Sequence, residues 1–473
     1  MKEFSTVIPD VIVINEGERF RASVLIEDGR IKRIDRSPAG EGGGENDLFL
    51  LPGVIDGHVH MREPGLTHKA TMESETRAAA RGGVTSVLDM PNVVPQTTTL
   101  RLLQERYALA MTCPDGQTGG TGRCHVNFGF FLGATNDNIE EIRQLDPSLS
   151  PGVKVFMGSS TGGMLVDREE TLRQVFRHSS TLIVTHCEDT ARINANTESL
   201  FKREGTASPP APLRGEGSSS LQFTPPLEGT GEASIRLHSL IRDHEACLHS
   251  TELAVRLARE EGARLHVAHI TTAQELDLFR PGDDRITAEA CVPHLLFSDE
   301  DYDTLGARIK CNPAIKTRAD RDALRRALSD GRIRTIATDH APHLPSEKQG
   351  GQKAMSGMPM VQFSLPAVLS LADEGVLSLE RAVELMCHIP ALLYGIPERG
   401  FIREGYRADL VLVRRRPWTV TKDCIESLCG WSPLEGRTLG WQVERTWVNG
   451  RLVWDGTGFP LPPQGERLTF CKP

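Results

Sequence analysis

An alternation of short apolar runs with helical patterns, from about residue 50 to about residue 340, constrains the fold of this 473-residue chain more than any other feature. The apolar runs have the length of strands, and the segments between them are long enough to cross over to a parallel neighbour. Eight such runs occur, at residues 51–58, 84–90, 124–132, 152–157, 181–186, 264–269, 285–291 and 333–339. Repeated strand–helix units of this kind predict an α/β fold, a parallel (β/α)8 barrel of the TIM type.

Helices and loops fill the segments between the apolar runs. Residues 70–83 (ATMESETRAAARGG) and 250–262 (STELAVRLAREEG) are rich in good helix formers and end at glycine, which predicts a helix in each. Three stretches rich in Gly, Pro and Ser, at residues 112–122, 203–231 and 344–357, predict loops. The middle stretch is long enough to form a flexible flap.

Both ends of the chain have the pattern of β-structure. Short apolar and polar runs alternate before residue 50, and ADLVLV and RTWVNGRLVWDG follow after residue 407, the latter with the hairpin signal Asn449-Gly450. Neither end is long enough to build a good core alone, so we expect them to join in one small β-sandwich. The predicted division is 1–50 and 395–473 for the sandwich and 51–394 for the barrel.

Composition narrows the class of partner. The formal net charge is −9, with no basic stripe of the kind that binds nucleic acid. No signal-peptide pattern and no run of about 18 apolar residues is present, so we expect a cytoplasmic protein that does not enter a membrane. The ten cysteines form no CxxC pair, which argues against a zinc ribbon or a disulfide scaffold. The expected partner is a small molecule.

Ionisable residues stand at the carboxyl ends of five of the predicted strands. They are His58 and His60, Lys154, His186, His269 and Asp339. The carboxyl ends of barrel strands converge on one face, so these six side chains are expected to meet in one pocket. A single histidine beside an apolar run is more often structural, but alternate residues of a strand share a face and can bind one ion. The convergence of all six predicts a metal site.

Lys154 needs a separate explanation, because an ammonium group cannot bind a cation. Its apolar neighbours in GVKVF predict burial rather than a place on the surface. Two interpretations remain open. The amine adds CO2 and becomes a carbamate that bridges two metals, or the lysine pairs with an acid.

Several motifs together carry a resemblance to a known family. The string LPGVIDGHVHMREPGLTHKATMESETRAAARGGVTSVLDMPNVVPQT is followed by GVKVFMGSS, THCED, HVAHITT, AEACVPHLLF, KCNPAIKTRADRDAL and IATDHAPH. From about residue 50 to 365 this pattern resembles the dihydroorotases of the amidohydrolase superfamily, and the flanking β segments are similar to that superfamily's small composite domain. The insertion at 203–231 is longer than a compact member needs.

The resemblance implies roles for individual residues. His58, His60 and Asp339 would hold one metal ion, His186 and His269 a second, and carboxylated Lys154 would bridge two ions, most simply Zn²⁺. Four further residues would contact the substrate, namely Arg62 and Asn92 at its carboxylate, His343, and Asn312 at its ring. The other histidines, His340 among them, receive no role.

The reaction that the resemblance implies is the reversible hydrolysis of (S)-dihydroorotate to N-carbamoyl-L-aspartate in de novo pyrimidine (UMP) biosynthesis. A hydroxide shared by the metals would attack the ring amide, with Asp339 as proton shuttle, since no second acid precedes strand eight. Allantoinase and dihydropyrimidinase are the alternatives, although Arg62 suits a ring that carries a carboxylate. A non-catalytic scaffold is a weaker alternative, because none of the six ligands is missing. Whether the chain forms a homodimer stays open.

Overall fold

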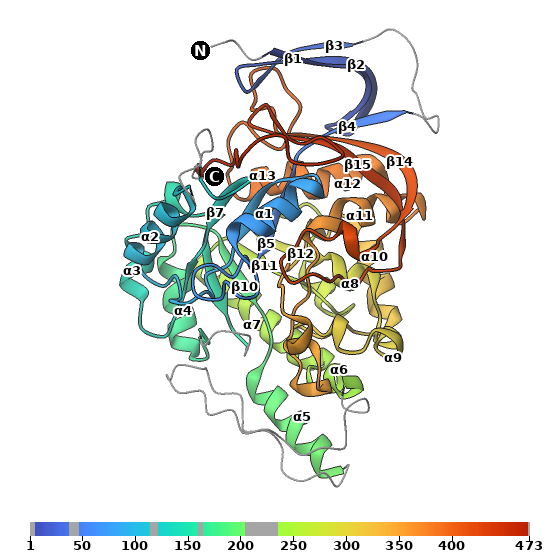
Figure 1. Cartoon of the computed structure of the whole chain (residues 1–473). Coiled ribbons are helices and arrows are strands. Elements are labelled where there is room, and N and C mark those ends of the chain that lie inside the picture. Colours follow the sequence, from blue (N-terminus) through green and yellow to red (C-terminus); the bar gives the residue numbers. More distant parts are fainter. Residues whose placement is uncertain (1–4, 37–46, 114–121, 159–163, 204–234, 472–473) are drawn as a thin grey trace.

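The computed structural model describes residues 5–36, 47–113, 122–158, 164–203 and 235–471 (Figure 1). Its central part contains two parallel sheets whose strands follow chain order. One sheet has the order β5-β6-β7, and the other has the order β13-β12-β11-β10-β9-β8. Only Phe131 separates β7 from β8, and an isolated parallel bridge joins Val59 at the end of β5 to His340.

The strands of these sheets coincide with the eight predicted apolar runs. Their bounds are β5 (Val54–Val59), β6 (Val84–Asp89), β7 (Asn127–Phe130), β8 (Leu132–Gly133), β9 (Val153–Phe156), β10 (Ile183–His186), β11 (Leu265–Val267), β12 (Ile286–Cys291) and β13 (Ile333–Ala337). Nearly every residue in them is buried, because helices cover a parallel sheet on its outer face. Residues 124–132 contain β7 and the first residue of β8, so one predicted run corresponds to two short strands.

Helices follow the strands around the central part. The longer ones are α1 (Met72–Arg81), α2 (Leu100–Ala110), α4 (Glu169–His178), α5 (Thr190–Arg203), α7 (His244–Glu261), α10 (Arg318–Asp330) and α11 (Ser364–Asp373). The shorter ones are α3 (Ile139–Arg143), α6 (His238–Ile241), α8 (Val292–Leu296), α9 (Tyr302–Leu305), α12 (Leu379–Val383) and α13 (Ile389–Leu393).

Caps explain where the two predicted helices begin and end. The Thr71 side chain accepts a hydrogen bond from the backbone of Ser74 at the start of α1, which ends at Gly82. Helix α7 begins before the predicted residue 250, because the Asp243 side chain caps the backbone of Ala246. It ends as predicted at Gly262, whose φ of +67° is in the left-handed region.

Strands from both ends of the chain form one further sheet, at the top of Figure 1. Its order is β16-β15-β14-β4-β1-β2-β3. The bounds are β1 (Ser5–Asn15), β2 (Glu18–Glu27), β3 (Arg30–Arg36), β4 (Leu48–Pro52), β14 (Leu410–Thr419), β15 (Thr438–Val448) and β16 (Arg451–Trp454). The two ends of the chain therefore join as predicted. The sheet is continuous across the two ends, because β4 pairs with β1 on one side and with β14 on the other.

The remaining predictions concern loops and membranes. Residues 344–357 contain only two short 3₁₀ turns, whereas residues 114–121 and residues 204–231 of the predicted flap 203–231 lie outside the described residues. After β16 the chain returns to the central part, where the backbone of Phe128 in β7 bonds to Glu466 and Leu468. Within the described ranges, no helix is long and apolar enough to cross a bilayer.

Candidate metal centre

The six residues expected at one metal site line a single cavity. His58 lies in β5, Lys154 in β9 and His186 at the end of β10, while His269 and Asp339 follow β11 and β13 by two residues. Described residues that line the cavity are His58, His60, Arg62, Lys154, Phe156, His186, His269, Asn312, Asp339, Ala341, Ser356 and Gly357. The parallel strands thus bring their carboxyl ends together, as expected.

His58, His60 and Asp339 form one group of potential metal ligands. The Nε2 atoms of His58 and His60 lie 3.4 and 3.0 Å from Oδ1 of Asp339. Burial lowers the pKa of His60 to about 4, so its ring is neutral near pH 7. Although burial alone would raise the pKa of Asp339, the two imidazoles outweigh it and hold this pKa well below its ordinary value. This group therefore offers the neutral ring of His60, the imidazole of His58 and one carboxylate.

Hydrogen bonds on the far side of these rings fix which nitrogen faces the carboxylate. Nδ1 of His58 lies 2.9 Å from Oε1 of Glu289, and Nδ1 of His60 lies 2.7 Å from Oδ1 of Asn92. Both partners are acceptors, so a neutral ring that donates to its partner through Nδ1 turns the lone pair of Nε2 toward Asp339. A cation placed between these two nitrogens and the Asp339 carboxylate could be bound by all three groups. Histidines that bind metals commonly have the other ring nitrogen held by a hydrogen bond, as here.

His186 and His269 form the second pair. Nδ1 of His186 lies 2.9 Å from Nε2 of His269, and Nε2 of His186 lies 2.9 Å from Oε2 of Glu188. Glu188 also pairs with Arg242. The proton of His186 therefore belongs on Nε2, which leaves Nδ1 with a lone pair that faces His269. Burial holds the pKa of His269 well below its ordinary value, which keeps this second ring neutral as well.

Lys154 lies between the two groups and is completely buried. Its Nζ has no hydrogen-bond partner and no carboxylate within 4.0 Å among the described residues, so the alternative of an ion pair is not met there. Burial lowers the pKa of Lys154, which favours the neutral amine that reacts with CO2. The donor set of four histidines, one aspartate and a buried amine fits divalent cations.

Three residues of the site have backbone conformations that are rare outside glycine. The φ angles of Arg62, His269 and Asp339 are +66°, +38° and +47°. Such conformations persist where surrounding contacts hold them, and they concentrate at functional sites. They support the view that this cavity is the functional site of the chain.

Arg62 supplies the positive side of the cavity. It is 3% exposed, its Nε donates to the carbonyl of Pro342 at 3.1 Å, and its Nη2 lies 3.0 Å from Nε2 of His343. No acidic side chain of the described part of the chain lies within ion-pair distance of this guanidinium. A buried guanidinium without a protein carboxylate suits an anionic group of a ligand.

The other three predicted substrate contacts are arranged around Arg62 and His60. Oδ1 of Asn312 is buried without a partner in the described structure, at a residue that lines the cavity. Asn92 and His343 are not among the lining residues; Asn92 contacts His60, and His343 contacts Arg62 and Lys69. Burial beside the two cations lowers the pKa of His343 to about 3. These two residues thus support the groups that face the cavity.

Glu289 and Glu188 are site residues that the sequence analysis does not identify. Burial alone would raise the pKa of Glu289, but His58 and His266 outweigh it and hold this pKa well below its ordinary value. Glu289 also accepts a bond from the backbone of His269 at 3.2 Å. The signal for both acids is present in the sequence, since Glu289 interrupts the apolar run ITAEAC and Glu188 follows the ligand His186 in THCED.

Known proteins resemble this chain over most of its length. Residues 49–453 match the amidohydrolase family. Dihydroorotase from Halobacterium salinarum is 34% identical over 414 residues, which cover 87% of this chain and 87% of that protein. Allantoinase from Bacillus velezensis is 28% identical over 486 residues, which cover 99% of this chain and 98% of that protein. The structure of L-hydantoinase (dihydropyrimidinase) from Arthrobacter aurescens is similar, with a TM-score of 0.83 and 25% identity over 98% of this chain and 99% of that one.

Proposed function

Because the chain belongs to the amidohydrolase family, we propose that it is a dihydroorotase, which interconverts (S)-dihydroorotate and N-carbamoyl-L-aspartate. The ring of dihydroorotate is a cyclic amide that carries one carboxylate. In this role the enzyme serves the de novo synthesis of UMP. Small-molecule chemistry of this kind agrees with the cytoplasmic location expected from the sequence and with ten cysteines that form no disulfide.

One observation carries the choice of substrate. Arg62 is a buried cation at the cavity wall without an acidic partner among the described residues. The carboxylate of dihydroorotate matches it, with His343 behind the guanidinium and Asn312 at the ring. Allantoin and dihydrouracil have no carboxylate, so they would leave this charge unpaired and buried.

The side chains around the cavity support a division of labour in the hydrolysis. His58, His60 and Asp339 would hold one zinc ion, and His186 and His269 would hold a second. Carboxylated Lys154 would bridge the two. The bound metals would lower the pKa of a water and polarise the amide carbonyl. The Asp339 carboxylate takes the proton of the attacking water and delivers it to the ring nitrogen that leaves. Arg62 fixes the ring so that its amide carbonyl lies beside Asp339.

We also propose that the central part of the chain is a closed barrel. The two parallel sheets would close into a (β/α)8 barrel through the contact of Val59 with His340 and the short connection at Phe131. The division into 1–50, 51–394 and 395–473 is part of the same proposal, and a homodimer is its expected assembly. Nucleic acid and membranes have no part in it.

The decisive experiment compares three substrates on the purified, zinc-loaded protein. We expect turnover of dihydroorotate, and of carbamoyl aspartate in the reverse direction, with little turnover of allantoin or dihydrouracil. Metal analysis of the same sample is expected to give two zinc ions per chain. Turnover of allantoin or dihydrouracil without dihydroorotate would replace the proposed substrate by one of the alternatives.

Allantoinase is the alternative with a specific observation in its favour, namely the similarity to the Bacillus velezensis enzyme over nearly the whole chain. The two activities make opposite demands on Arg62. Replacing Arg62 by a neutral side chain would change the activity of an allantoinase little. The same change would remove the contact of a dihydroorotase with the substrate carboxylate.

A further inference from the structure

His340 is the residue next to Asp339, and its backbone links two walls of the site. Its N–H donates to the carbonyl of His58 at 3.3 Å, and its carbonyl accepts from the N–H of His60 at 2.7 Å. On the other side, a parallel bridge joins it to Met358, which follows the cavity-lining Gly357. The backbone of His340 therefore contacts the segment that carries His58 and His60 and, through Met358, the opposite wall of the cavity.

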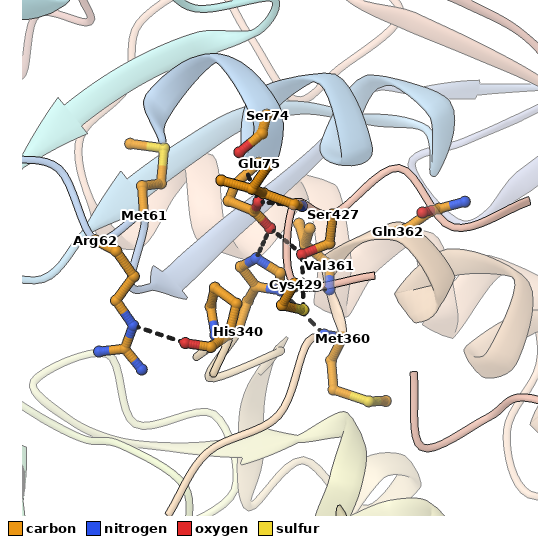
Figure 2. A network of polar contacts seen from close by, with 12 residues as sticks. Met61, Arg62, Ser74, Glu75, His340, Met360, Val361, Gln362, Ser427 and Cys429 are labelled. Atoms are coloured by element: carbon orange, nitrogen blue, oxygen red, sulfur yellow. Dashed lines mark hydrogen bonds and ion pairs between the residues drawn. The ribbon is translucent and has the colours of Figure 1, made fainter. Parts of the chain in front are cut away.

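The imidazole of His340 points away from the cavity and is fully engaged. Its Nδ1 accepts hydrogen bonds from the backbone N–H groups of Met360 at 3.0 Å and Val361 at 3.2 Å. Its Nε2 lies 2.7 Å from Oε2 of Glu75, a residue of α1 (Figure 2). Because Nδ1 accepts, the proton belongs on Nε2, and Glu75 accepts it.

Glu75 in turn connects this imidazole to the C-terminal part of the chain. Its Oε2 accepts from the Ser427 hydroxyl at 2.6 Å, and its Oε1 accepts from the N–H of Leu428 at 3.1 Å and from the Ser74 hydroxyl at 2.8 Å. Figure 2 shows Glu75 between the ring of His340 and Ser427. Both Glu75 and His340 are almost inaccessible to solvent, at 2% and 1% exposure. Every strong acceptor position of this carboxylate is therefore in use.

We propose that His340 and Glu75 are positioning residues that hold Asp339 in its left-handed conformation. The backbone of Asp339, with φ of +47°, is costly for an aspartate and needs fixed neighbours. His340 provides them through four segments: the end of β5, the loop around Met360, helix α1, and residues 427–428 through Glu75. The inference rests on the proposed function only in that Asp339 is the group it positions.

Two substitutions test this role. Glu75→Gln keeps the shape of the side chain but replaces one acceptor oxygen by a donor, so it opposes the Nε2–H of His340. His340→Asn keeps an acceptor near the N–H groups of Met360 and Val361 but cannot reach Glu75. Each is expected to lower kcat by about 10-fold to 100-fold and to change KM by less than about twofold. This is the range of effects found for residues that orient metal ligands without binding the metal themselves. Both substitutions break the same hydrogen bond between His340 and Glu75. The kcat of the double variant is therefore expected to be no lower than that of the more impaired single variant.

Glu426→Gln is the matched control. Glu426 pairs with Arg77 and Arg81 of the same helix α1, at 2.9 and 2.6 Å, from the same C-terminal segment, but it does not contact His340. It is expected to leave kcat within about twofold of the wild type. An equal loss of kcat in Glu426→Gln would overturn the proposal, because docking of the segment on α1 would then explain the effect.

A second measurement does not depend on the substrate. The rate at which a chelator removes zinc from the loaded protein is expected to rise about 10-fold in Glu75→Gln and His340→Asn and to stay unchanged in Glu426→Gln. If the wild type hydrolysed none of the three cyclic amides, the proposed function would fail while this rate still decides the role of His340. Folded Glu75→Gln and His340→Asn proteins with wild-type kcat and wild-type zinc release would overturn it. Should Glu75→Gln not fold, His340→Asn decides alone.

Discussion

Arg62 is the residue on which the choice of substrate depends. Arg62→Gln removes the charge and keeps a polar side chain of similar reach. Loss of a buried charge pair with the substrate carboxylate costs about 2 kcal/mol or more, so KM for dihydroorotate should rise at least about 30-fold. Steady-state kinetics check this, with Arg308→Gln, a partly exposed arginine paired with Glu435, as control. An unchanged KM for dihydroorotate would show that Arg62 does not bind the carboxylate.

Asp339 is expected to move the proton. Asp339→Asn retains the shape of the carboxylate and one oxygen ligand but cannot accept a proton at neutral pH. We expect kcat to fall by about 10²-fold to 10⁴-fold, the usual contribution of a positioned acid–base group. Zinc content is measured in the same preparation, so that loss of metal is not mistaken for loss of proton transfer. Near-normal turnover would assign the shuttle to another group.

Lys154 is the proposed bridge between two metal ions. Its buried, unpartnered amine should require CO2 before it can serve as an anionic bridge. Apoprotein reconstituted with zinc in buffer free of CO2 is therefore expected to regain little activity, and addition of bicarbonate should restore it. Full recovery without bicarbonate would contradict a carbamate on Lys154.

At the scale of elements, the loop of residues 344–357 depends on a buried lysine. Nζ of Lys348 donates to the carbonyls of Lys310, Met355 and Gly357 at 3.0, 2.7 and 2.7 Å, and burial lowers its pKa to about 7. Gly357 lines the cavity. Carbonyl groups thus hold the loop against the site, together with the ion pair between Lys69 and Glu347 at 2.7 Å.

Lys348→Met is expected to release this loop, because methionine fills similar space but donates no hydrogen bonds. Amide hydrogen exchange of residues 344–357 should accelerate at least about 10-fold, which corresponds to about 1.4 kcal/mol of lost local stability. KM should rise, since the wall of the cavity moves with the loop. Lys353→Met, in the same loop, is the comparison. Equal exchange in wild type and Lys348→Met would show that other contacts hold the loop.

The sequence predicts the elements with continuous burial and misses those fixed by distant partners. Eight apolar runs identify the parallel strands, because burial on both faces leaves an uninterrupted pattern. The six ligand-type residues follow from their places at strand ends. Glu289 and the loop around Lys348 could not be placed, because their partners, His58 and Lys310, are far away in sequence. The continuous seven-stranded sheet was missed because a periodic pattern does not specify that β4 has a neighbour on both sides.

At the scale of the whole molecule, buried neutral histidines predict sensitivity to acid. Burial lowers the pKa of His60, His125 and His294 to about 4 and, beside Arg62, that of His343 to about 3. Between pH 6.5 and about 4 these rings take up protons only after unfolding, so protons favour the unfolded chain. Their contribution to stability is complete above pH 6.5 and is lost as the pH falls toward 4.

Each such histidine adds up to about 1.4 kcal/mol per pH unit to the slope of the unfolding free energy in this window. Urea unfolding between pH 7 and 4 measures the slope. His125→Gln, at a position away from the cavity-lining residues, should reduce the slope by one histidine's share. If the unfolding free energy of the wild type and of His125→Gln had the same slope against pH, His125 would not contribute to the acid sensitivity.

The pairing of β4 with β14 also has a consequence for how the chain folds. Pro52 lies opposite Leu410, so this pairing closes a loop that contains every strand of the two parallel sheets. The entropy of closing a long loop grows only slowly with its length, so the native state loses little stability by this arrangement. The rate is affected more, because contacts between residues distant in sequence raise the contact order and slow folding. The seven-stranded sheet should therefore mature last, after the parallel strands have brought its two halves within reach of each other.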